Sequence, residues 1–259
     1  MKIAVLVKQV PGSESALRVG TEEQWVDESA LDFEMNESDS YALEEALLIK
    51  EKSAAGGEVV VVSMGPPERT PKVIREALAK GADRGIHIHE EPPYENDPFL
   101  IAGIFASVLR DEQFDLLLSG LQSADLATGQ TGVILGEFLE MATATLVMAT
   151  ELQDGSIKVK RELESGWSQW ITLPLPASIT IQSGLNQPRY PSLRGIMGAK
   201  KKEIKVLSKA DLIAGNTPLQ SWERLYVHKK EKRTEMIEGD LNQVVDQLVN
   251  VLRTEIKVL

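Results

Sequence analysis

The first 150 residues alternate between short apolar runs and longer segments in which apolar side chains have helical spacing. Continuous apolar runs are typical of strands buried on both faces of a sheet. They occur at residues 3–7, 58–63, 85–89, 115–120 and 145–149. The segments between them predict helices, at residues 36–49, 70–80, 97–110 and 132–139. This alternation predicts an α/β fold, with a Rossmann-like, mostly parallel sheet and helices on both faces.

The predicted helices begin at polar residues suited to capping. Asn36 or Ser38 can accept a hydrogen bond from a free N–H group of the first helical turn. Thr70-Pro71 and Asp97-Pro98 each place a capping side chain before proline, which is favoured at the first helical position. Capping alone would account for the residue types at 36–39.

The pattern changes after residue 150. Asp154-Gly155, between two alternating segments, predicts a β-hairpin, and further strands are predicted at 159–164, 168–173 and 177–181. Prolines and glycines interrupt residues 184–202, which show little regular pattern. Residues 207–233 look like an extended arm, and residues 241–256 look like an amphipathic helix.

A loop of small and hydroxyl residues follows the strand at 115–120 and precedes the helix at 132–139. A helix that begins near 129–131 would point its free N–H groups, and the positive end of its dipole, at an anion above the strand. The residues therefore suggest a phosphate site. Two other interpretations stay open: Asp125 or Thr128 caps the helix, or the loop is an ordinary strand-to-helix connection.

Several segments should meet at the same edge of the sheet. Ligands of open parallel sheets bind outside the carboxyl ends of the strands, where the strand order reverses. That edge would bring together Leu6, Lys8, residues 63–65 and residues 120–131, with residues 36–39 in reach. We therefore predict that residues 1–206 form an α/β nucleotide-binding domain. Residues 207–259 have too little local core, so the arm and last helix should pack on another chain.

Composition narrows the possible chemistry. The chain has no cysteine, which excludes disulfides, thiolate nucleophiles and iron–sulfur ligation. His87 and His89 share a strand face, where a metal pair is conceivable, but no third ligand is suggested nearby, so no metal site is predicted. No apolar run approaches the ~20 residues that span a bilayer. The start of the chain lacks a signal-peptide pattern, so we expect a cytoplasmic protein without membrane insertion.

Charge is unevenly distributed along this acidic chain. The net charge of −11 argues against nucleic acid as a partner. Residues 184–233 contain 12 Lys+Arg and 4 Asp+Glu, a balance of +8, so the remainder carries −11 − 8 = −19. The basic segment is either a solvated face or a surface that docks onto an acidic partner.

Five short motifs resemble a known family. They are Val7-Lys8-Gln9-Val10, Gly81-Ala82-Asp83-Arg84, residues 161–166 (RELESG), residues 186–197 (NQPRYPSLRGIM) and residues 199–202 (AKKK). Together they closely resemble the β (small) subunit of electron transfer flavoprotein, over essentially the whole chain. The resemblance implies a fold like that of the adenine-nucleotide α-hydrolases.

The resemblance implies a heterodimer in which an α subunit holds most of a redox-active FAD. It implies that the small subunit itself binds AMP in a structural role. The implied cofactor-binding residues are Leu6, Asn36, Glu37, Ser38, Asp39, Met64, Gly120, Leu121, Gln122, Ser123, Ala124, Asp125, Leu126, Ala127, Thr128, Gly129, Gln130 and Thr131.

The resemblance also implies a recognition loop at residues 184–202 that docks dehydrogenases, with Leu193 as its apolar anchor. Glu162 is implied to pair with an arginine of the α subunit. The implied partner-binding residues are Glu162, Arg189, Tyr190, Leu193, Arg194, Ile196 and Met197. Electrons would pass from dehydrogenases through FAD to a membrane quinone oxidoreductase or similar acceptor. No catalytic residue is expected in this chain, because the flavin carries the chemistry.

Two alternatives stay open. The chain could be the β subunit of an electron-bifurcating flavoprotein, in which a second FAD replaces AMP. It could instead be a stand-alone ATP- or AMP-binding protein of the stress-protein type, which would be a monomer.

Overall fold

The computed structural model describes residues 1–53, 56–212, 217–228 and 234–258. Contacts divide the chain into two compact units, residues 1–224 and residues 225–259. The predicted arm includes residues 213–216 and 229–233, which lie outside the described residues. None of the described helices is both long enough and apolar enough to cross a bilayer.

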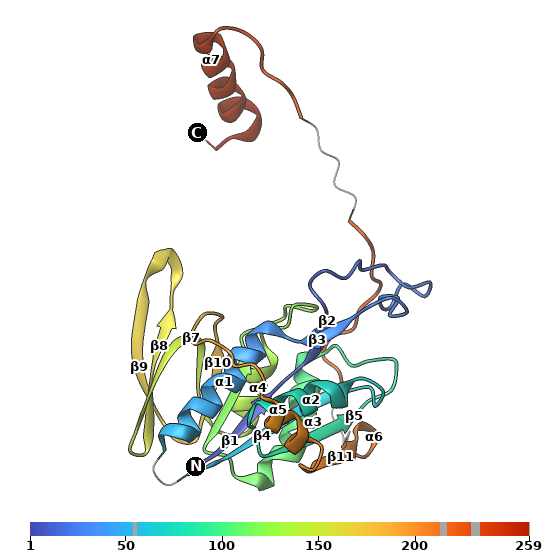
Figure 1. The fold of residues 1–259 in the computed structure, drawn as a ribbon. Coiled ribbons are helices and arrows are strands. Elements are labelled where there is room, and N and C mark those ends of the chain that lie inside the picture. The colour runs from blue at the N-terminus through green and yellow to red at the C-terminus, as the bar shows by residue number, and fades with distance from the viewer. Residues whose placement is uncertain (54–55, 213–216, 229–233, 259) are drawn as a thin grey trace. The chain divides into compact units, whose positions relative to one another are not determined.

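The first unit is built on a nine-stranded sheet with the strand order β11-β5-β4-β1-β6-β10-β7-β8-β9. All pairs from β11 to β7 are parallel, and β8 and β9 extend the sheet as an antiparallel hairpin (Figure 1). The strands are β1 (Lys2–Leu6), β4 (Glu58–Gly65), β5 (Arg84–His89), β6 (Leu116–Gly120), β7 (Ala142–Gln153), β8 (Ser156–Glu162), β9 (Ser168–Pro174), β10 (Ala177–Ile181) and β11 (Ile204–Ser208). The predicted Rossmann-like α/β class is confirmed.

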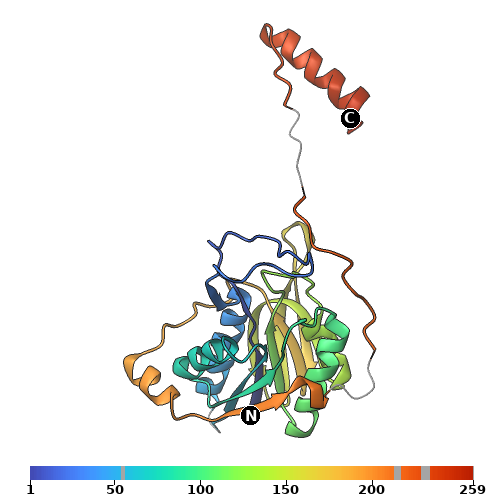
Figure 2. The ribbon, with the colours of Figure 1, turned by 90° about the vertical axis from the view of Figure 1, so that its right-hand side faces the viewer.

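Helices cover both faces of this sheet, as Figure 2 shows from the side. The helices are α1 (Glu37–Lys52), α2 (Thr70–Lys80), α3 (Pro98–Leu109), α4 (Thr131–Phe138), α5 (Leu193–Ala199) and α6 (Lys209–Leu212). Alternate side chains of β1 divide between two cores: Ile3 and Val5 pack with α1 and α2, whereas Ala4 and Leu6 pack with α3 and α4. Continuous apolar strands are therefore required, because both faces are buried.

Several smaller elements complete the two units. They are β2 (Gln9–Pro11) and β3 (Phe33–Met35), which pair with each other, the short helices η1 (Arg110–Glu112) and η2 (Glu164–Gly166), and, in the second unit, α7 (Leu241–Val251) with η3 (Leu252–Ile256). The predicted hairpin turn at Asp154-Gly155 is confirmed, since Gln153 pairs with Ser156. The predicted last helix is confirmed too, with a capping box between Asp240 and Gln243.

Three local predictions are wrong. Thr70 does not cap α2; it is the first helical residue, and Arg69 precedes it. Residues 184–202 contain α5, whose apolar positions were obscured by flanking prolines and glycines. Residues 204–208 form β11, which pairs with β5 at the sheet edge, so the predicted start of the arm at residue 207 falls inside a strand.

Candidate functional site

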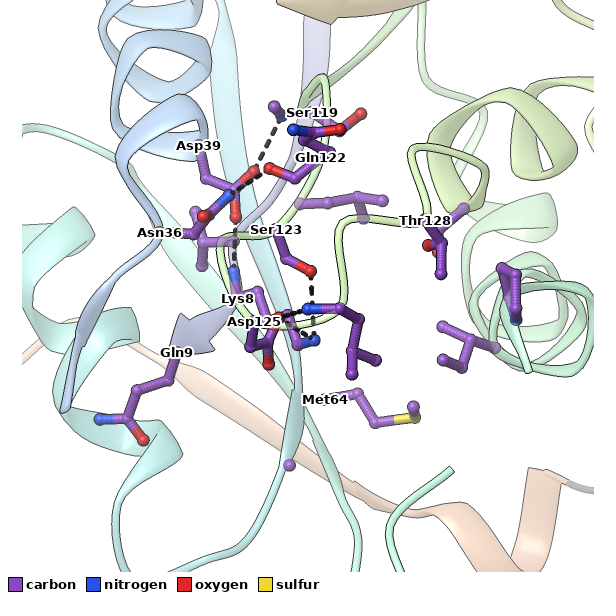
Figure 3. Close-up of a pocket in the computed structure, with 18 of the residues that line it drawn as sticks. Lys8, Gln9, Asn36, Asp39, Met64, Ser119, Gln122, Ser123, Asp125 and Thr128 are labelled. Carbon is purple, nitrogen blue, oxygen red and sulfur yellow. Dashed lines mark hydrogen bonds and ion pairs between the residues drawn. The ribbon is translucent and has the colours of Figure 1, made fainter. Parts of the chain in front are cut away.

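A pocket lies at the carboxyl ends of β4, β1 and β6 (Figure 3). The chain adds β4 and β5 on one side of β1 and then returns to place β6 on the other side, so the strand order reverses there. This is the position at which open α/β sheets bind ligands. The pocket contains about 1110 Å³ of atom-free space, part of it open to solvent.

Most of the residues that the resemblance implied for AMP surround this pocket. Those that line it are Leu6, Asn36, Asp39, Met64, Gly120, Leu121, Gln122, Ser123, Asp125, Leu126, Thr128, Gly129, Gln130 and Thr131. Glu37, Ser38, Ala124 and Ala127 are not among the lining residues. We call residues 120–131 the nucleotide loop.

Asp39 joins the two central strands at the floor of the pocket. Its Oδ2 accepts a hydrogen bond of 2.8 Å from the N–H of Lys8, just after β1. Its Oδ1 accepts one of 2.8 Å from the N–H of Gly120, the last residue of β6. The carboxylate is buried, so the two backbone groups depend on it for their hydrogen bonds. Asp39 thereby fixes the start of the nucleotide loop.

Gly120 permits the close approach of α1 to the end of β6. A Cβ at this position would lie 2.3 Å from Ser38 Oγ, 2.4 Å from Asp39 Oδ1 and 2.8 Å from the backbone N of Asp39. Such distances are far inside van der Waals contact, and one of the atoms is backbone. Any larger residue at 120 would separate the helix start from the nucleotide loop.

Asn36 and Ser38 bind the nucleotide loop instead of capping α1. Asn36 Nδ2 donates to the carbonyl of Gln122 at 3.0 Å, and Asn36 Oδ1 accepts from the N–H of Ala124 at 3.0 Å. Ser38 Oγ also donates to the Gln122 carbonyl, at 2.8 Å. Asn36 makes no side-chain cap hydrogen bond. The capping interpretation of residues 36–39 is therefore wrong.

A cation and a helix start face the pocket. Lys8 Nζ lies 2.8 Å from Asp125 Oδ1 and 3.4 Å from Ser123 Oγ (Figure 3). α4 begins at Thr131, and no described side chain caps it at Gln130. Asp125 accepts instead from the N–H of Leu126 at 2.7 Å, so capping by Asp125 is wrong. The helix N-terminus suits an anion, whereas the Lys8 ammonium group is paired with Asp125 and would have to exchange that partner for a ligand.

Aromatic side chains, Trp25 and Tyr94, also line the pocket and were not predicted from the sequence. The Trp25 and Tyr94 rings meet edge to face, with their centroids 5.7 Å apart. The Arg69 guanidinium lies 4.1 Å from the Phe33 ring and 5.6 Å from the Tyr94 ring. The lining residues that the resemblance did not imply are Val7, Lys8, Gln9, Trp25, Gly65, Pro66, Arg69, Thr70, Glu90, Tyr94, Glu95, Asn96, Pro98, Ile101, Phe105, Ser119 and Gly132. Such a wall suits a planar ring.

Burial raises the pKa of Asp39 to about 6, although hydrogen bonds from Lys8 and Gly120 oppose the shift. A carboxyl whose pKa is higher in the folded chain stabilises the fold most below pH ~4, and this contribution is lost as the pH rises to about 6. At 1.36 kcal/mol per pKa unit, the loss is about 3 kcal/mol. We expect Asp39→Asn to remove this dependence. Urea unfolding of both proteins at pH 4.5 and pH 7.5 measures it; parallel pH profiles would contradict the assignment.

Both histidines of β5 have a partner within the chain. His87 Nε2 lies 2.9 Å from the Gly65 carbonyl, and His89 Nε2 lies 2.9 Å from Glu91 Oε1. Burial lowers the pKa of His87. No group of three or more metal-binding side chains occurs within the part of the chain that the structure describes.

The loop at residues 184–202, here the docking loop, presents apolar side chains to solvent. Tyr190 is 94% exposed, Leu193 83%, Met197 73% and Ile196 44%. Arg194 is exposed beside them. All of them lie on α5 or just before it, so the structure brings these implied partner-binding residues together.

Arg189 and Glu162 differ from that group because both have partners in this chain. The Arg189 guanidinium forms ion pairs with Glu44 at 2.9 Å and with Glu51 at 2.6 Å. Glu162, at the end of β8, accepts a hydrogen bond of 2.9 Å from Gln182. Their predicted contacts with other proteins stay predictions.

The chain was compared with known proteins. The family model for the electron transfer flavoprotein domain matches residues 24–212. The chain is 35% identical to electron transfer flavoprotein subunit beta of Methylophilus methylotrophus, over 97% of this chain and 98% of that protein. It is 33% identical to the subunit beta of Bacillus subtilis over the whole of both chains, and 38% identical to that of Homo sapiens over 82% and 83%.

The matched residues include most of the strand ends that surround the pocket and the whole docking loop. The relatives also match the chain over most or all of its length, so the similarity extends beyond the sheet. This chain belongs to the electron transfer flavoprotein family, among its beta subunits.

Proposed function

We propose that this chain is the small subunit of a cytoplasmic heterodimer that carries electrons on FAD from dehydrogenases to a membrane quinone oxidoreductase or similar acceptor. The bound FAD, held mostly by the α subunit, supplies the redox chemistry. This chain supplies a structural AMP site, a docking loop and a surface for the α subunit. Its full-length similarity to beta subunits of electron transfer flavoproteins is the support for this assignment.

The pocket residues fit a nucleotide monophosphate. Lys8 and the start of α4 would hold the phosphate, because both favour an anion. Trp25, Tyr94 and Met64 offer an apolar wall to a base. The observation that carries the AMP proposal is that Lys8, the start of α4 and these aromatic residues all line one pocket.

The nucleotide content of the purified heterodimer tests the proposal. We expect one AMP and one FAD per heterodimer after denaturation and chromatography of the released nucleotides. Two FAD and no AMP would contradict the AMP site and favour the bifurcating type.

Part of the pocket lining favours the bifurcating type as a second candidate function. The lining also includes Pro98, Ile101 and Phe105 of α3, which the AMP proposal does not use, so a larger dinucleotide has apolar surface available. The stand-alone ATP- or AMP-binding alternative predicts a monomer in solution. Size-exclusion chromatography of the chain with and without an α subunit separates it from both heterodimeric proposals.

The last helix offers a face for the α subunit. Leu241, Val245 and Leu248 have the spacing of one helical face and are 79%, 48% and 46% exposed. A helix with an uncovered apolar face needs a partner surface. We therefore propose that residues 225–259 pack on the α subunit.

Leu193→Ala is expected to weaken docking of donor dehydrogenases while FAD and AMP content stay unchanged. Leu193 is 83% exposed at the start of α5, so its truncation removes an apolar anchor without opening the core. An anchor of this kind contributes about 2 kcal/mol or more, so we expect a roughly thirtyfold rise in KM. The measurement is steady-state reduction of the heterodimer by a purified flavin-dependent dehydrogenase.

Leu17→Ala is a matched control, because Leu17 is also an exposed leucine, 57% accessible, but lies outside the docking loop. Its KM should equal that of the wild type. Equal KM values for Leu193→Ala and wild type would refute the role of Leu193.

A further inference from the structure

Two glutamate side chains of α1 are buried, although charged side chains of a helix are ordinarily exposed to water. Glu44 and Glu45 are 5% and 7% exposed. A buried charge is costly unless it is paired and hydrogen-bonded. Each of them has a partner in the docking loop, about 140 positions later in the chain.

Glu44 holds Arg189 through both its side chain and its backbone. Arg189 Nη2 lies 2.9 Å from Oε1 of Glu44, and Arg189 Nε lies 2.9 Å from Oε2. The N–H of Arg189 also donates to Oε2, at 3.0 Å. A bidentate guanidinium–carboxylate pair fixes orientation as well as distance. The additional backbone bond fixes the path of the chain at this residue.

Glu45 bonds the docking loop at Asn186, three residues before Arg189. Its Oε2 accepts a hydrogen bond of 3.0 Å from Asn186 Nδ2, which also donates to the Tyr41 carbonyl at 3.0 Å. The other oxygen, Oε1, accepts from Thr150 Oγ1 on β7. Glu45 thus connects α1, the sheet and the docking loop.

The far end of the docking loop is fixed by α2. Arg75 Nη1 donates to the carbonyls of Ala199 and Lys202, at 2.5 and 2.7 Å. The exposed residues Tyr190, Leu193 and Met197 lie between this attachment and Arg189. The apolar side chains are therefore presented by a segment that is held at both ends.

We propose that Glu44 and Glu45 form a clasp that positions the docking loop for its partner protein. The clasp rests on the proposed docking function, since its purpose is to hold Tyr190 and Leu193 in one orientation. Both are positioning residues, because neither reaches the exposed apolar surface. A partner would then meet a preorganised anchor and would not have to order the loop on binding.

Glu44→Gln tests the clasp, because it keeps the side-chain shape and removes the charge that faces Arg189. Arg189→Lys is the second variant: Arg189 is partly exposed, so the fold should tolerate lysine, which cannot form the bidentate pair. Glu51→Gln is the comparison variant: Glu51 lies on the same helix and pairs with the same guanidinium, but it is exposed and makes no bond to the Arg189 backbone, so its loss should cost little.

Amide hydrogen exchange of residues 186–199 in the full heterodimer reports the positioning directly. We expect exchange to be about tenfold faster in Glu44→Gln and Arg189→Lys, a factor equivalent to ~1.4 kcal/mol, and close to wild type in Glu51→Gln. The KM for the purified dehydrogenase should rise in the first two variants, with kcat and AMP content unchanged.

The proposed clasp and the proposed docking function can fail independently in these experiments. If Leu193→Ala raises KM but Glu44→Gln and Arg189→Lys change neither exchange nor KM, the clasp is refuted and docking stands. If Leu193→Ala leaves KM unchanged, the docking function fails, and the clasp has no partner for which to position the loop.

Discussion

Asp39→Ala is expected to lower the free energy of unfolding by roughly 2–4 kcal/mol and to release the nucleotide. The substitution leaves the N–H groups of Lys8 and Gly120 without their hydrogen bonds, in a buried place that water does not reach easily. The end of β6 would then lose its bond to α1, and the nucleotide loop would keep only the bonds of Asn36 and Ser38. Urea unfolding and nucleotide analysis of the purified heterodimer measure both effects.

Glu37→Ala is the control for this prediction. It removes the same charge two residues earlier on α1, but Glu37 is exposed and does not line the pocket. We expect a change of less than about 1 kcal/mol, from the lost interaction with the helix dipole, and full nucleotide content. Equal nucleotide content in Asp39→Ala and Glu37→Ala would show that Asp39 does not organise the site.

Gly195→Ala is expected to displace α5 and to raise the KM for donor dehydrogenases about tenfold, a change equivalent to ~1.4 kcal/mol. A Cβ on Gly195 would lie 2.2 Å from the carbonyl oxygen of Ala79 on α2. This oxygen is backbone, so the docking loop must move away from α2. Overpacking of this kind costs about 1–3 kcal/mol of stability. Steady-state reduction kinetics and thermal unfolding check the two effects.

Gly198→Ala, on the same short helix, provides the contrast. A Cβ there would meet nothing within 4 Å, and alanine favours a helix over glycine by about 1 kcal/mol. KM should stay at the wild-type value and stability should rise slightly. Identical KM values for the two alanine variants would mean that contact with α2 does not set the position of the docking loop.

The sequence predicted the location of the pocket because local patterns determine it. Continuous apolar strands indicate a sheet covered on both faces, and the order of strands and helices indicates where β1 and β6 must separate. Residues 120–131 were singled out because a loop of small and hydroxyl residues follows an apolar strand and precedes a helix. The same topology places Leu6, residues 63–65 and residues 36–39 at this edge, and the resemblance then implied which of them contact a nucleotide.

The remaining pocket residues could not be predicted, since their positions depend on tertiary contacts. Trp25 and Tyr94 come from irregular segments that meet only in the folded chain. The same limit explains the errors in capping. Asparagine often caps helices, so Asn36 was interpreted as a cap. Its side chain instead bonds a carbonyl and an N–H group of the nucleotide loop, more than 80 positions away in the chain. A long-range partner of this kind has no signature in the local sequence.

Photolabelling with 8-azido-AMP tests most directly whether this edge of the sheet holds a nucleotide. The heterodimer, freed of its own nucleotide, is irradiated with the probe, digested and analysed by mass spectrometry. We expect label on peptides containing residues 6–9, 64–70 or 120–132, and we expect excess AMP to reduce it. Label confined to other peptides, or label that AMP does not reduce, would contradict it.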